Sequence, residues 1–106
     1  MRIDLDEREA LLIVTALGTY QNRIGQKAGW FQRKRKPTLN ARLADAMIIG
    51  AHNDCDEINR ARRNTDRIIE RAIALGHEVS ALRERVKETC GVDTQKVNNY
   101  PKDETI

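Results

Sequence analysis

Residues 58–86 read INRARRNTDRIIERAIALGHEVSALRERV, and this stretch decides the fold. Apolar or small residues recur along it at alternating steps of three and four. The series consists of Ile58, Ala61, Thr65, Ile68, Ala72, Leu75, Val79, Leu82 and Val86. This spacing is a heptad repeat with Ile58 at position a and Ala61 at position d. A strict repeat of seven predicts a long helix that wraps left-handedly around a partner helix.

The partner of this helix is either a second copy of the chain or another helix of the same chain. In a parallel dimer Glu57 would face Arg62 and Glu78 would face Arg83, and both pairs are attractive. The small residues in the first half of the stripe bury little apolar area, which favours close packing within one chain. A homo-oligomer, with a dimer favoured, and an intramolecular bundle therefore both stay open.

The composition indicates one folded domain with an extensive charged surface, because 40% of its 106 residues are hydrophobic and 33% are charged. Cys55 and Cys90 have no CxxC spacing, which favours a reducing compartment over a disulfide scaffold. No apolar run approaches the roughly 20 residues of a membrane span. The acidic N-terminus also lacks the layout of a signal peptide. We therefore expect a cytoplasmic protein with no membrane partner.

Three helices are expected, over about residues 5–24, 39–50 and 54–89. The first opens with acidic residues, which suit the helix dipole. Asp4 and Asp6 each stand three residues before a glutamate, Glu7 and Glu9, which is the spacing of a capping box. The fold class is therefore all-α, with a short helical base followed by a long C-terminal helix that carries the heptad pattern.

The boundaries of the later helices follow from glycines and caps. Gly50 can end the second helix, whose apolar side is expected to consist of Leu39, Leu43, Met47 and Ile48. The heptad continues in phase across Gly76, so the third helix is predicted to run through it. We expect a single helical domain over residues 1–91. Residues 92–106 contain few apolar residues and are expected to form a flexible tail.

Residues 26–38 are expected to form the one long loop of the chain. Gly25 can stop the first helix. Pro37 disfavours helical geometry at Lys36, the residue before it. The next helix is then expected to start after Thr38 or Asn40.

Positive charge is concentrated around this predicted loop. The sequence from Ala10 to Ala44 contains seven Lys or Arg residues and no acidic residue, while the rest of the chain sums to −4. Cations bind phosphates, and the rings of Trp30 and Phe31 can stack on bases. The same segment suits an acidic protein partner, or a solvated loop from which Trp30 folds back as a lid on the core.

The candidate partner surface comprises two groups of residues. The first consists of Arg23, Lys27, Trp30, Phe31, Arg33, Lys34, Arg35, Lys36 and Arg42, and the second is a row on the long helix formed by Arg60, Arg63 and Arg67 and continued by Arg71. The row could follow a phosphate backbone, or it could be a solvated helix face partly neutralised by Asp66 and Glu70.

Patterns for catalysis or metal binding are weak. His52, Cys55 and Asp56 lie at helical spacing, but no second cluster of ligand types accompanies them. The paired carboxylates of Asp54 and Glu57, and of Asp66 and Glu70, are similar to the helical acid clusters that hold Mg²⁺ in nucleotide-processing bundles, but helix caps and surface ion pairs explain them equally well. We expect no catalytic residue, no metal site and no cofactor.

The sequence therefore predicts a non-enzymatic interaction or adaptor protein that self-associates through the 58–86 stripe and presents its basic loop to an acidic partner. One alternative is a nucleic-acid-binding accessory or regulatory protein that uses residues 23–42 and the Arg60–Arg71 row. A third hypothesis is a subunit of a larger assembly whose tail acts as an arm.

Overall fold

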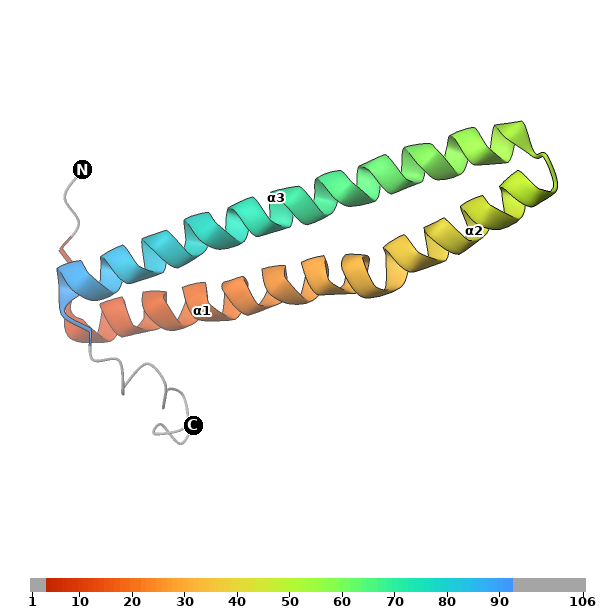
Figure 1. Ribbon diagram of the computed structural model, residues 1–106. Coiled ribbons are helices and arrows are strands. Elements are labelled where there is room, and N and C mark those ends of the chain that lie inside the picture. The colour runs from red at the N-terminus through yellow and green to blue at the C-terminus, as the bar shows by residue number, and fades with distance from the viewer. Residues whose placement is uncertain (1–3, 93–106) are drawn as a thin grey trace. The chain divides into compact units, whose positions relative to one another are not determined.

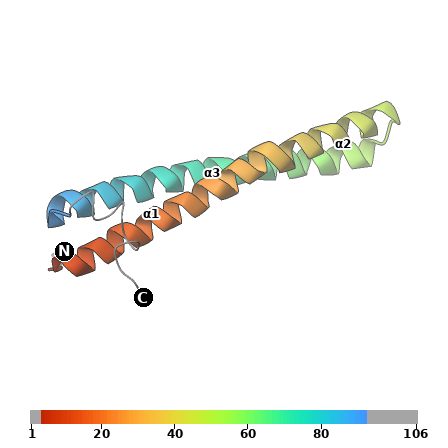
Figure 2. The same ribbon diagram turned by 90° about the horizontal axis from the view of Figure 1, so that it is seen from below.

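A computed structural model describes residues 4–92 of the chain, and these residues form helices and no strand. The elements are α1 (Glu7–Trp30), the π-helical turn η1 (Phe31–Arg35), α2 (Lys36–Ile48) and α3 (His52–Cys90). The first three follow one another without a break, so they form a single helical run (Figures 1 and 2). The all-α fold class is confirmed. The described residues contain two continuous helical runs in place of the three helices that we expected.

The predicted loop over residues 26–38 is wrong, because the whole segment is helical. Gly25 does not end α1, since it keeps a negative φ inside the helix. Pro37 does not break the chain either, because the backbone remains helical on both sides of it.

The π-turn explains how one helical run passes through a proline. Inside a helix Pro37 can neither donate to the carbonyl of Arg33 nor avoid a clash with it. One wider turn relieves the clash: the amide of Lys36 donates to the carbonyl of Phe31, five residues back. The hydroxyl of Thr38 donates to the carbonyl of Lys34 at 2.8 Å and so satisfies an acceptor beside the wide turn.

The predicted cap at Asp6 is confirmed by its hydrogen bonds, although α1 begins at Glu7, two residues later than predicted. The amide of Glu9 donates to Oδ1 of Asp6 at 2.8 Å, and the amide of Asp6 donates to Oε1 of Glu9 at 3.2 Å. This reciprocal pair is a capping box formed with aspartate as the cap.

A short turn of three residues, 49–51, joins α2 to α3. Gly50 supports it with a φ of +71°, and the amide of Ala51 donates to the carbonyl of Ala46 at 2.9 Å. The break expected near Gly50 is therefore confirmed, although α3 begins at His52, two residues earlier than predicted. As predicted, α3 runs through Gly76 without interruption.

The chain divides into two compact units, each with its own apolar cluster. Unit 1 comprises the residues up to Arg23 and those from Gly76 on, and unit 2 comprises Ile24–Leu75. The unit 1 cluster consists of Ala10, Leu11, Val14 and Val92, with Leu5, Val86 and Cys90 packed against it. The unit 2 cluster consists of Leu39, Ala46 and Ile58, with Leu43, Ala51, Cys55 and Ala61 packed against it.

Val92 lies in the core of unit 1, so the expected flexible tail over 92–106 does not begin at its first residue. Its amide donates to the carbonyl of Lys87 at 3.0 Å, just beyond the end of α3. Residues 93–106 lie outside the described part of the chain.

Candidate interaction surfaces

The heptad stripe of α3 is only partly free for a second copy. Its a residues are buried from Ile58 to Val79, and Ala61, Ile68 and Val86 are half-buried. Leu75 and Leu82, both at position d, are exposed. At position e, Ile69 is also buried. The face that α3 buries within its own chain is therefore centred on positions a and e, and the d residues remain at its edge.

Two arginines at position e are engaged inside their own chain. Nε of Arg83 donates to the carbonyl of Val14 at 3.1 Å. Arg62 is half-buried, and its Nη1 donates to Oδ1 of Asn59 at 3.2 Å. These arrangements disfavour the pairs expected between subunits, in which Arg62 and Arg83 would meet glutamates of a second copy.

Gly18 allows the close approach of α1 and α3 within unit 1. A Cβ atom at this position would lie 3.2 Å from Nε of Arg83. The arginine therefore lies across the bare backbone of α1 and reaches the carbonyl of Val14. The sequence analysis did not identify this contact, because nothing in the local pattern links residues 18 and 83.

An apolar strip remains on one side of unit 1. Helix segments of α1 and α3 run antiparallel there, with Arg83 level with Val14. Because a helix turns by about 100° per residue, a residue three positions after a core residue is displaced to one side of the core-facing direction. When two helices pack antiparallel, the residues displaced in this way on both helices lie on the same side of the pair. The residues placed there, which we call the apolar flank, are Ile13, Leu17, Tyr20 and Leu82. All except half-buried Leu17 are exposed.

A basic surface covers much of unit 2. The unit holds eleven Lys or Arg residues against six Asp or Glu residues and so carries +5, which leaves −2 for the rest of the chain. Arg33, Lys34 and Arg35 occupy consecutive exposed positions of η1, while Lys36 forms an ion pair with Asp66 at 2.9 Å. Lys27, Arg42, Arg60, Arg63, Arg67 and Arg71 are also exposed. Arg23 is exposed as well, but it belongs to unit 1.

The aromatic pair accompanies the cations of η1. Trp30 is 51% exposed, so it does not form the lid over the core that we considered. Phe31 is half-buried, and its ring meets that of Trp30 edge to face at 5.0 Å between centroids. A half-exposed indole beside three free cations can contact an apolar group or stack on a base.

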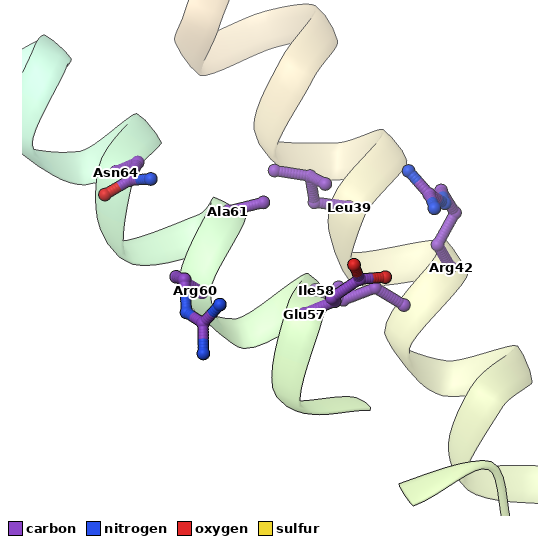
Figure 3. Close-up of a pocket in the computed structure, with 7 residues that line it drawn as sticks. All are labelled: Leu39, Arg42, Glu57, Ile58, Arg60, Ala61 and Asn64. Carbon is purple, nitrogen blue, oxygen red and sulfur yellow. The ribbon is translucent and has the colours of Figure 1, made fainter. Parts of the chain in front are cut away.

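Two shallow hollows lie between α2 and α3 in unit 2. In the first, of about 330 Å³, Leu39 of α2 and Ala61 of α3 point toward one another, and Arg42, Glu57 and Arg60 are among the other lining residues (Figure 3). The second, of about 300 Å³, lies nearer the turn and is lined by Arg42, Asp45, Ala46, Ile49, Asp54, Glu57 and Ile58. The second hollow therefore combines an apolar floor with three carboxylates.

The end of α2 differs from the prediction. Met47 and Ile48 do not share the buried side of Leu39 and Leu43, because both are exposed together with Ile49. Three consecutive aliphatic residues cannot all face one side of a helix. This run directly before Gly50 is the sequence signal that could have identified an exposed apolar turn.

Other kinds of site find little support in residues 4–92. Within this range no three His, Cys, Asp or Glu side chains gather closely enough to hold a metal ion. None of the helices there combines the length and apolarity needed to cross a membrane. The chain matches no known protein family, no curated protein and no solved structure.

Proposed function

We propose that the protein is a small non-enzymatic interaction protein that self-associates through its apolar flank. The observation that carries this proposal is the exposure of Ile13, Tyr20 and Leu82 on one side of unit 1, beside an already packed core. Such a strip on a helix pair is covered when a second pair packs on it, as in a four-helix bundle. Covering large, half-exposed apolar side chains contributes on the order of 1 kcal/mol each.

The proposed interface retains one member of the predicted stripe and adds residues of α1. Leu82 is a d residue of the heptad, whereas the other members of the apolar flank come from the first helical run. Because the a residues from Ile58 to Val79 are buried in their own chain, they support the within-chain packing that we considered alongside the dimer.

The basic surface of unit 2 is proposed to receive an acidic partner. Its exposed cations lie on rigid helix and not on a loop, so their spacing is fixed before binding, which lowers the entropy cost of association. Opposite charge on the partner would speed the encounter and make it sensitive to salt.

The dimer is tested by light-scattering mass on a sizing column. At low protein concentration Leu82→Asp, at a side chain 46% exposed, should convert a dimer to a monomer of unchanged helicity. Leu12→Asp is the matched control, because Leu12 is 42% exposed but lies about 100° from Ile13 around α1. A wild-type chain that is already monomeric at high concentration would refute the proposal.

Nucleic-acid binding is the second candidate, favoured by the half-exposed Trp30 next to the free cations of η1. Replacing Arg33, Lys34 and Arg35 with Ala should abolish retention on DNA or RNA and leave the dimer formed through the apolar flank intact. Arg85→Ala removes an exposed cation of unit 1 and serves as the control. Equal retention of the triple variant and the wild type would exclude this candidate.

The assembly hypothesis concerns residues outside the described range. A chain ending at Val92 keeps all the described residues of the unit 1 core and should therefore fold. If the tail acts as an arm, this truncation should lose higher-order complexes while the dimer persists. Complexes of unchanged size would remove the hypothesis.

A further inference from the structure

The turn between α2 and α3 carries a strongly exposed apolar group. Met47, Ile48 and Ile49 are 67%, 82% and 75% exposed, and we call them the apolar tip. They are the most exposed large apolar side chains among the described residues. Consecutive exposed aliphatic residues mark interaction sites more often than scattered ones do.

Carboxylates surround this tip. Asp45, Asp54 and Glu57 line the same hollow as Ile49, which has a volume of about 300 Å³. Arg42 is the one cation among its lining residues. The sequence contains no Lys or Arg between Arg42 and Arg60. The tip is therefore an apolar projection with an acidic edge.

We propose that the apolar tip of one copy docks on the Trp30 and η1 surface of a second copy. The two surfaces are complementary: aliphatic groups with an acidic edge meet a half-exposed indole flanked by Arg33 and Arg35. This inference rests on the proposed function, because it names the acidic partner of the basic surface as the hairpin turn of another copy.

The two surfaces of one copy cannot meet each other. Both belong to unit 2, and α2 separates them as a continuous helix. The fifteen residue-to-residue steps from Arg33 to Ile48 correspond to roughly 20 Å of helix at 1.5 Å per residue. The contact is therefore intermolecular and head to tail, which leaves one free surface at each end of a growing assembly.

A membrane is a poorer occupant for the apolar tip. Biological surfaces that attract peripheral proteins are usually anionic, and the carboxylates of Asp45, Asp54 and Glu57 would be repelled by them. Opposite charge is available instead on the chain's own basic surface, whose unit carries +5. A contact of this size is small, so association should depend on both concentration and salt.

The test uses complementation in a Leu82→Asp background, which removes the proposed dimer and isolates the head-to-tail contact. One chain also carries Ile48→Asp and Ile49→Asp, and the other carries Trp30→Ala, Arg33→Glu and Arg35→Glu. Analytical ultracentrifugation should show the Leu82→Asp parent growing with concentration. Each variant alone should be monomeric, and their equimolar mixture should form a heterodimer and nothing larger.

A heterodimer is the decisive outcome. One chain of the mixture keeps only its apolar tip intact and the other keeps only its Trp30 and η1 surface intact, so a single contact can form between them. Arg85→Glu is the control, since it reverses an exposed cation of unit 1, outside the basic surface, and should leave parental association unchanged. Should Leu82→Asp impair folding, Tyr20→Asp supplies a second background. A mixture that stays monomeric, or neutral-lipid vesicles that bind the tip while the parent never self-associates, would overturn the proposal.

Failure of this inference is distinguishable from failure of the proposed dimer. The dimer is read from the difference between the wild-type chain and Leu82→Asp, and the head-to-tail contact is read only among chains that carry Leu82→Asp. Either result can therefore be negative while the other is positive.

Discussion

Gly50 carries the turn between α2 and α3 through its backbone conformation. Its φ of +71° is strained for any residue with a Cβ, although a Cβ there would meet no other atom within 4 Å. Gly50→Ala should therefore lower the free energy of unfolding by about 1–2 kcal/mol, measured by urea titration of helicity.

Gly25 provides the matched control for this prediction. It also has open space for a Cβ, but it lies inside α1 with a negative φ. Gly25→Ala should raise the free energy of unfolding by about 0.5–1 kcal/mol, because alanine favours the helix. Equal effects of both substitutions would mean that φ at position 50 does not limit the turn.

Gly18 and Arg83 should be coupled. Gly18→Ala gains about 1 kcal/mol of helix propensity, but its Cβ would crowd the guanidinium that bonds to the carbonyl of Val14. The two effects should nearly cancel in the wild-type chain, whereas Gly18→Ala in an Arg83→Ala chain should stabilise by about 1 kcal/mol. A double-mutant cycle of urea titrations measures the difference, and strict additivity would contradict the contact.

At the scale of elements, the pairing of α2 with α3 depends on few side chains. Leu39 is 1% exposed and contacts a cluster that contains only Ala46 and Ile58 as further buried members. Leu39→Ala should lower the free energy of unfolding by about 2–5 kcal/mol. Leu12→Ala removes the same atoms from an exposed side chain and should cost less than about 1 kcal/mol. Similar losses for the two variants would show that the cluster does not hold α2 in place.

The sequence was sufficient for features that depend on local chemistry. The reciprocal Asp6 and Glu9 cap and the break near Gly50 follow from spacing within a few residues, and the passage of α3 through Gly76 follows from the phase of the heptad repeat on both sides of it. The Pro37 region could not be predicted in this way. The rule that proline disfavours the helix is correct, but a wide turn in the backbone can relieve the clash without a loop.

The surfaces were harder to predict than the helices, because burial depends on what lies opposite. A heptad identifies a long apolar stripe, yet it does not tell whether positions d or e join the a residues in the core. Here Ile69 at e is buried while Leu82 at d is exposed. Likewise Met47 and Ile48 continue the apolar pattern of α2 but lie beside the turn, where no core covers them.

For the whole molecule, charge and core packing divide along the same boundary. Unit 2 carries +5 and its own cluster around Leu39, while the remaining residues carry −2 and include the cluster around Val14. Association through unit 2 should therefore weaken as salt rises. Association through the apolar flank of unit 1 should not.

Separate cores predict separate local stabilities. The backbone amides of a helix exchange with solvent when the packing that holds it opens, and that packing differs between the two parts of α3. Leu39→Ala should therefore accelerate hydrogen exchange in residues 52–64 much more than in residues 77–90, as measured by mass spectrometry of peptide fragments.

The converse substitution makes this test symmetrical. Val14 is fully buried in unit 1, so Val14→Ala should accelerate exchange in residues 77–90 and leave 52–64 nearly unchanged. α3 is continuous through Gly76, and a glycine inside a helix costs about 1 kcal/mol, so opening that starts in one unit can stop there. Exchange that rises evenly along α3 in both variants would instead show that the helix unfolds as one cooperative element, with Gly76 offering no boundary.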